Sequence, residues 1–197
     1  VSDSSTGLLQ VYILRNGHSQ IRSWDPVTPT SIDVMMSSVS GGYLVEWLRL
    51  DAAFSPYYLD DNLTIMSGTT LTLLPYSSLT VKSNRGISVN GVLESSSATI
   101  TGSDWNGITL SENGLVDMNG GQLIGAPLTS GPSLSELSID GMILSNAPLY
   151  VSGLGILEIS NSLLHQSDYC INGNGGHVMV SHSIIQSCSH VGAMLTQ

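Results

Sequence analysis

Charge is what this sequence has least of. Charged residues make up 10% of its 197 residues, against about a quarter in an average soluble domain. The formal net charge is −10, and the five basic residues all precede residue 86: Arg15, Arg22, Arg49, Lys82 and Arg85. Proteins that bind nucleic acid neutralise phosphates with Lys and Arg. The composition therefore argues against a nucleic-acid partner.

Long apolar runs and cysteines are also scarce. No stretch reaches the roughly 20 apolar residues of a membrane-spanning helix, so no membrane span is expected. The two cysteines, Cys170 and Cys188, are compatible with an oxidising compartment. They occupy different points of the repeat described below, so the sequence leaves a disulfide between them open. We expect that any signal peptide has been removed before Val1, and that the end near Gln197 belongs to a fragment or is covered by something else.

What the sequence does contain is a repeat of about 21 residues. Its best-matched part is a sextet with an apolar residue at each end and a turn residue in third place. The sextets begin 21, 20 and 21 residues apart, at Met118, Ile139, Ile159 and Val180. A fixed period in this range is the signature of a solenoid.

The third place of the sextet predicts a stack of sharp bends. The four residues found there are Gly120, Gly141, Asn161 and His182. Glycine has no steric penalty in left-handed backbone, and Asn and His are enriched there among the other residue types. We therefore expect a structural ladder of left-handed turn residues, one per coil.

Upstream of the sextets, short strands begin at residue 62. Apolar-x-apolar triplets start at a strict spacing of 8, at Leu63, Leu71, Leu79 and Ile87. Alternation with period two indicates strands with one buried face. Three such strands make one triangular coil, and the first position then recurs at Ile108, Leu128, Leu149 and Ile171. This spacing predicts five to six stacked coils.

Residues 1–60 lack the repeat and are predicted to form a cap. Asn16-Gly17 favours a tight turn, so the segment around it is predicted to be a β-hairpin. Residues 43–50 alternate as a strand with two occupied faces, although a short helix is an alternative. The segment also holds two of the three tryptophans, and an aromatic-rich cap would cover the open end of the first coil.

The coil sequence resembles the right-handed parallel β-helix superfamily, which includes the pectate lyases. Residues 68–94 and the stretch WNGITL at 105–110 are similar to the first coils of its non-catalytic, surface-exposed branch. The resemblance covers about residues 60–197. It implies an all-β fold: a right-handed, single-stranded parallel β-helix over residues 61–197, with about 21 residues per coil, behind an N-terminal β-rich cap at 1–60. Fold alone does not imply function.

Catalysis is not expected, because the residues offer no convincing constellation. The resemblance implies an Arg base for a lyase, and no Arg or Lys follows residue 85. Glycosidases need paired carboxylates about 5 Å apart for retention or about 6.5–9.5 Å for inversion. Asp117 and Glu158 share one matched position, before the sextet, and are the weak catalytic candidates. One such pair is expected by chance, so the alternative is two solvated surface carboxylates.

Cofactor and metal sites are not predicted either. The four late histidines fall at four different repeat positions: His165, His177, His182 and His190. Trp105, Tyr150 and Tyr169 do not align as a sugar platform, and Thr64, Thr72 and Thr80 start three strands of one coil rather than a stacked row. Asn62-Leu63-Thr64 is an N-glycosylation sequon that can be used only in a secretory setting.

These observations favour a secreted or cell-surface structural protein. We expect a stalk, adhesin segment or filament subunit, joined head to tail because the basic residues lie near one end and the acidic repeats at the other. Surface glycans are a possible second class of partner. The alternative function is a polysaccharide-active lyase or glycosidase, or a carbohydrate-binding module, on the same fold.

Overall fold

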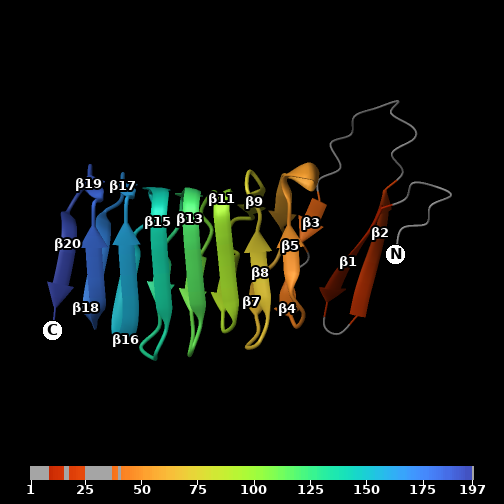
Figure 1. Ribbon diagram of the computed structural model, residues 1–197, viewed down its shortest axis with the longest axis horizontal. Helices are drawn as coiled ribbons and strands as arrows, with labels where there is room; N and C mark the ends of the chain where they lie inside the picture. Colours follow the sequence, from red (N-terminus) through yellow and green to blue (C-terminus); the bar gives the residue numbers. More distant parts are fainter. Residues whose placement is uncertain (1–8, 16–17, 25–36, 40, 197) are drawn as a thin grey trace.

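The computed structural model describes residues 9–15, 18–24, 37–39 and 41–196. Over these ranges the chain is a parallel β-solenoid of about 7 turns with ~21 residues per turn, and 2% of it is helical (Figure 1). The expected all-β solenoid is confirmed. The right-handed winding stays a prediction, favoured by the general handedness of parallel crossovers.

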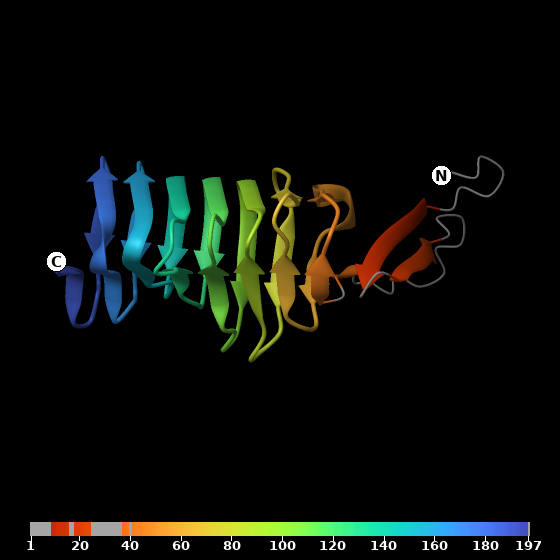
Figure 2. The ribbon, with the colours of Figure 1, turned by 90° about the horizontal axis from the view of Figure 1, so that it is seen from below.

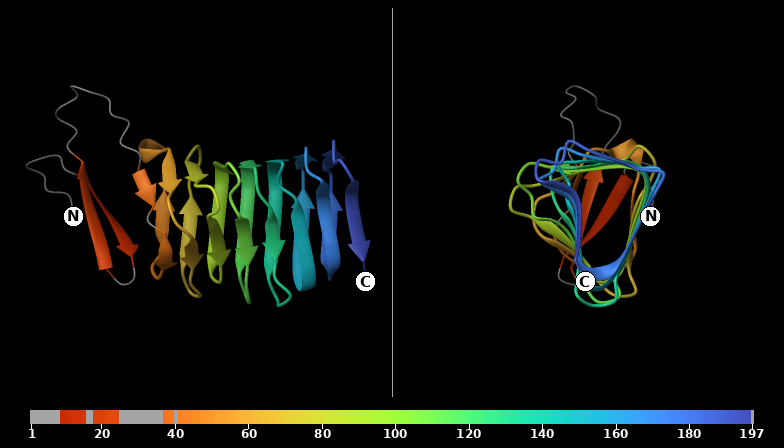
Figure 3. Two further views of the ribbon diagram at one scale, coloured as in Figure 1. Left: turned by 180° about the vertical axis from the view of Figure 1, so that it is seen from behind. Right: turned by 90° about the vertical axis from the view of Figure 1, so that its left-hand side faces the viewer.

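Three parallel sheets form the sides of the solenoid, and the view along the axis shows their triangular outline (Figure 3). Face A contains β4 (Gly42–Leu44), β7 (Leu63–Ile65), β10 (Gly86–Val89), β12 (Gly107–Leu110), β14 (Leu128–Ser130), the first parts of β16 (Leu149–Ser160) and β18 (Tyr169–Ser181), and β20 (Val191–Thr196).

Faces B and C complete each coil, and successive coils follow one another in chain order (Figure 2). Face B contains β5 (Leu48–Leu50), β8 (Thr70–Leu73), the first parts of β11 (Val92–Gly102), β13 (Leu115–Ile124) and β15 (Glu136–Ser145), and the second parts of β16 and β18. Face C contains β3 (Ser37–Val39), β6 (Tyr57–Leu59), β9 (Ser78–Val81), the second parts of β11, β13 and β15, β17 (Leu163–His165) and β19 (Ile184–Gln186).

The spacing-8 triplets form β7, β8, β9 and β10, as predicted. Their apolar residues point inward and are at most 3% exposed, because alternation places every second side chain on the core side. The recurring first position is one vertical column, in which each residue pairs with the next: Leu63, Ile87, Ile108, Leu128, Leu149 and Ile171. The sextet starts from Met118 to Val180 stack in the same way on face B.

The coils begin earlier than the predicted boundary at residue 61. The strands β3, β4 and β5 pair in register with β6, β7 and β8, so residues 37–59 already follow the solenoid. The turn count of about 7 therefore exceeds the predicted five to six. The sequence does not reveal this coil because its strands start at irregular intervals instead of the regular interval of 8.

The stretch 43–50 is a corner and not one strand, so that prediction was wrong. It contains β4 and β5 with a bend at Val45–Trp47 between them, which turns the chain from face A to face B. Trp47 is 74% exposed at this bend and therefore does not cover the core. A single 3-10 turn, η1 (Ala52–Phe54), follows, with Asp51 accepting from the backbone of Ala53.

The predicted hairpin is present as β1 (Leu9–Arg15) and β2 (His18–Trp24). The two strands pair antiparallel from Leu9–Trp24 to Arg15–His18 and form a sheet of their own. The turn residues Asn16 and Gly17 lie outside the described residues. The hairpin lies at the β4 end of the solenoid (Figure 1), where a β-rich cap was expected.

Candidate functional site

The three faces of the solenoid differ in charge. Five carboxylates lie in the described strands of the coils, and all five are on face B: Glu94, Asp117, Glu136, Asp140 and Glu158. The remaining acidic residues of residues 41–196 lie in corners between strands. The described strands of faces A and C contain no Asp, Glu, Lys or Arg, and their outer sides carry Ser, Thr, Asn, Gln, Tyr, His or apolar side chains instead. The acidic side chains of the described strands are therefore confined to one side of the coils.

The candidate carboxylates Asp117 and Glu158 both belong to one outward column of face B. Ser138 pairs with each of them, so they are two coils apart, or about 9.6 Å at about 4.8 Å per step. Both side chains are exposed. A carboxyl that acts as a general acid usually lies in an apolar pocket, whereas both of these side chains lie on the solvent side of face B. The arrangement matches solvated surface carboxylates better than a catalytic pair.

A closer pair of carboxylates, which the repeat pattern did not reveal, lies in the same column. Glu94 is in register with Asp117 on the adjacent coil, and its Oε2 accepts a hydrogen bond from the Thr72 hydroxyl at 3.2 Å. Glu94 precedes the sextet region, so the repeat alignment did not include it. Glu94 lies 23 residues before Asp117, whereas Ile87 and Ile108 of the first column lie 21 apart, so the repeat spacing does not reveal the pair.

Asp140 accepts two side-chain hydrogen bonds from the next coil. The Ser160 hydroxyl donates to its Oδ1 at 2.5 Å, and Asn161 Nδ2 donates to the same oxygen at 2.7 Å. These two hydrogen bonds, that of Ser160 first, lower the pKa of Asp140 below its usual 3.8. The contact ties two successive coils together on face B.

The turn ladder has the backbone that its residue types suggested. The φ angles of Gly120, Gly141, Asn161 and His182 are +69°, +62°, +50° and +47°. The ladder also extends one coil further toward the N-terminus. Ser97 lies opposite Gly120, because the residues on either side of the two are paired, and its φ is +47°. A side chain added to Gly120 would lie 3.1 Å from the Ser97 hydroxyl oxygen, which shows how closely these bends stack.

The histidines do not converge. His165 lies on face C, His177 on face B, His182 in the turn ladder and His190 in the corner before β20. Within the described residues, no group of three or more His, Cys, Asp or Glu side chains is arranged to hold a metal ion.

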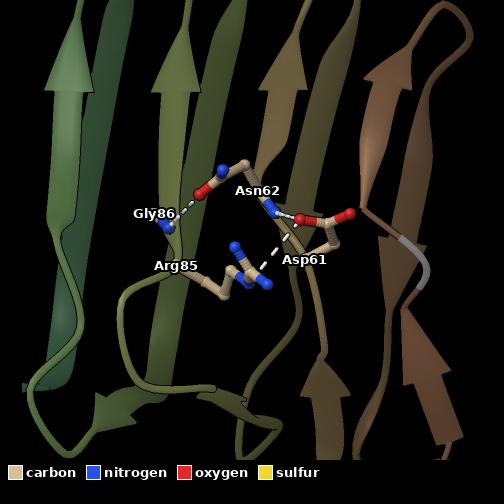
Figure 4. A network of polar contacts seen from close by, with 4 residues as sticks. All are labelled: Asp61, Asn62, Arg85 and Gly86. Atoms are coloured by element: carbon tan, nitrogen blue, oxygen red, sulfur yellow. Dashed lines mark hydrogen bonds and ion pairs between the residues drawn. The ribbon is translucent and has the colours of Figure 1, made fainter.

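Asn62, the residue of the sequon, connects two coils at the corner between faces C and A. Its Oδ1 accepts from the Gly86 backbone at 2.9 Å, and its own N–H donates to Asp61 Oδ1 at 2.8 Å (Figure 4). Arg85 Nε lies 3.6 Å from the same Asp61 oxygen. Asn62 is exposed, so the site is open to solvent, and its glycosylation stays a prediction.

Cys170 and Cys188 are bonded in the structure. Cys170 is the buried second residue of β18, Cys188 lies in the corner before β20, and their Cα atoms are 5.8 Å apart. Next to the bond, the rings of Tyr169 and His190 stack at 5.4 Å. The disulfide therefore joins two successive coils, although its cysteines occupy different points of the repeat.

A column of uncharged side chains runs along face A. Each member pairs with the next: Tyr43, Thr64, Ser88, Thr109, Thr129, Tyr150, Asn172 and Met194. Thr64, Thr72 and Thr80 were compared as the threonines of one coil, whereas this row joins residues of successive coils. The residue after each member of the first apolar column would have identified it.

A cavity of about 400 Å³ lies at the C-terminal end of this column. It is lined by Tyr150, Val151, Ser152, Asn172, Asn174 and Met194, from β16, β18 and β20. No charged residue lines it. Neither Asp117 nor Glu158 borders it, so the carboxylates and the cavity are on different faces.

Comparison of the chain with protein-family models, with curated proteins and with solved structures found no match. The resemblance to the pectate-lyase-like superfamily is therefore supported only at the level of a parallel β-solenoid. In the described ranges, no helix has both the length and the apolar character needed to cross a bilayer.

Proposed function

We propose that this chain is an extracellular structural and adhesive β-solenoid that associates with a second copy through its C-terminal coil. The observation that carries the proposal is the exposure of inward-facing apolar side chains in β18–β20. Val180 and Leu195 are 43% and 61% exposed, whereas Ile159, which precedes Val180 in its column, is 2% exposed. Packing against another coil would remove this apolar surface from water.

The opposite end of the solenoid favours a particular geometry of association. The inward residues of the first coil, Val39, Leu44 and Leu50, are already buried, with at most 8% exposure. A head-to-tail contact would need two open ends, and the inward residues of the first described coil show no comparable apolar exposure. Contact between two C-terminal coils is self-complementary and closes after two copies. We therefore propose a tail-to-tail dimer in place of the head-to-tail filament suggested by charge.

Two further features support the extracellular and non-catalytic parts of the proposal. The Cys170–Cys188 disulfide is typical of oxidising compartments. The carboxylates of face B are spread over four coils on an exposed side, as expected for solvation and solubility. Membership of the non-catalytic branch of the superfamily and location on a cell surface are parts of this proposal.

The proposal is tested by measuring the mass of the purified chain in solution. We expect size-exclusion chromatography with light scattering to show a dimer that dissociates on dilution. Val180→Asp places a carboxylate in the inward column, which should shift the protein to monomer. Met179→Asp is the matched control, because Met179 is also 43% exposed but points outward on face B, and it should leave the dimer intact.

Other outcomes count against the proposal. A wild-type chain that stays monomeric at millimolar concentration has no such contact. A dimer that survives Val180→Asp uses another surface. A series of oligomers whose mass increases with protein concentration indicates a head-to-tail filament. Circular dichroism of both variants establishes that a loss of the dimer is not a loss of the fold.

A further inference from the structure

The uncharged column of face A and the cavity at its C-terminal end together have the properties of a ligand site. The cavity volume of about 400 Å³ lies within the usual range of small-molecule sites, about 300–1,000 Å³. It is the place on face A where an aromatic ring, a side-chain amide and a hydroxyl come together. The outward side chains of Tyr150, Asn172 and Met194 come from three successive coils, and the solenoid backbone fixes the distances between them.

The side chains of Tyr150, Asn172 and Ser152 give the cavity polar groups that a ligand can pair with. Neither the Tyr150 hydroxyl nor the Asn172 amide has a side-chain hydrogen-bond partner among the described residues. The Ser152 hydroxyl donates to the Ser130 carbonyl at 3.1 Å, which leaves its oxygen as an acceptor. An amide offers donors and an acceptor in one group, so the site can pair with hydroxyls in either sense.

The uncharged lining of the cavity favours a neutral ligand. An anionic or cationic group bound here would lose water without finding an opposite charge, which is costly. The nearest basic residues along the chain precede residue 86, far from β16–β20. A neutral molecule with an apolar face and a rim of hydroxyls meets the Tyr150 ring and the Asn172 amide without that cost. Saccharide rings have this combination.

We propose that the cavity binds a neutral saccharide unit, stacked on Tyr150 and hydrogen-bonded to Asn172 and Ser152. A longer neutral glycan along the solenoid axis would meet the hydroxyls of Thr129 and Thr109 in the same column, about 4.8 Å apart. This site gives the adhesive part of the proposed function a ligand class, and it does not depend on the contact between C-terminal coils.

The test is a titration of the full chain with defined oligosaccharides, followed by calorimetry and by NMR. The probes are cellohexaose and chitohexaose as neutral chains, and hexagalacturonate as the anionic control. At least one neutral chain should bind saturably, with a Kd of about 1 mM or below. Hexagalacturonate should not bind.

Variants locate the binding at the cavity. Tyr150→Ala should weaken binding about tenfold, because it removes the ring on which the saccharide stacks, whereas Tyr150→Phe keeps the stacking and should change it about threefold at most. Tyr76→Ala removes an equally large ring that is 83% exposed at the corner after β8, and should have no effect. Circular dichroism checks the fold of each variant.

Three results overturn the inference: no saturable binding of either neutral chain, equal affinity of the wild type and Tyr150→Ala, or preference for hexagalacturonate. Light scattering of the same samples reports the dimer separately. A chain that dimerises but binds no saccharide refutes the site alone, and a monomer that binds through Tyr150 refutes the coil contact alone.

Discussion

At the scale of single residues, the bends between faces B and C depend on which side chains tolerate left-handed backbone. Gly120 and Gly141 do so without cost, and Asn161 and His182 do so more readily than most residue types. Ser97 has the same φ sign, but serine is not a typical left-handed residue, so the pattern of residue types did not reveal it. Asn161 also holds Asp140 through its amide.

Replacing Asn161 separates these two contributions. Asn161→Gly and Asn161→Ala both remove the hydrogen bond to Asp140, but only alanine adds a Cβ strain at positive φ. We expect Asn161→Ala to be about 1 kcal/mol less stable than Asn161→Gly. Urea unfolding of the two variants measures the difference.

The control is the same pair of substitutions at Ser138, in the middle of the extended strand β15. There the order should be reversed, because glycine in a strand is less stable than alanine by about 0.5–1 kcal/mol. If glycine is more stable than alanine at both positions, or alanine more stable than glycine at both, the left-handed ladder is contradicted.

At the scale of strands, the C-terminal coil is the least supported part of the solenoid. Among the described residues, β19 pairs only with β17, and β20 pairs only with β18. The Cys170–Cys188 bond joins this coil to the buried start of β18. The disulfide therefore adds a covalent restraint to the last described coil.

Breaking the disulfide should loosen this coil and leave the rest in place. In the double variant Cys170→Ala/Cys188→Ala, hydrogen exchange should increase in β19 and β20 but not in β7–β12. The cross-link closes a sequence separation of 18 residues, and its loss should lower stability by about 2–4 kcal/mol.

Reduction of the wild type should reproduce this exchange pattern, and a reductant should have no effect on the double variant. Unchanged exchange in β19 and β20 after either treatment would mean that the strand pairing alone holds the coil.

At the scale of the whole molecule, the solenoid is modular because each coil contacts only its neighbours. Leu128 and Leu149 occupy the same place in adjacent coils, and each follows a proline, Pro127 and Pro148. Removing one complete coil should therefore leave every inward column in register.

Deletion of residues 128–148 joins Pro127 directly to Leu149. We expect this variant to fold cooperatively and to be shorter by one coil step, about 4.8 Å, in small-angle X-ray scattering. It should be less stable than the full chain, since one contact between coils is lost.

The control deletion removes residues 128–149 and joins Pro127 to Tyr150. It places Tyr150 where the column needs an inward apolar residue, so this strand and the strands after it should lose their packing. If both deletions behave alike, the stacking register is not what specifies the fold.

The local pattern of the sequence determined the coils, because alternation and period are properties of neighbouring residues. It placed Leu63, Ile87 and Ile108 in one column and Asn161 in a left-handed bend, as the structure has them. It missed the coil at residues 37–59, whose short strands keep no regular interval. Only the tertiary structure decided which side chains meet across coils: the bond between Cys170 and Cys188, the collection of carboxylates on face B, and the cavity beside Tyr150. Those contacts depend on the exact path of each corner, which varies from coil to coil, so the average period of the repeat could not predict them.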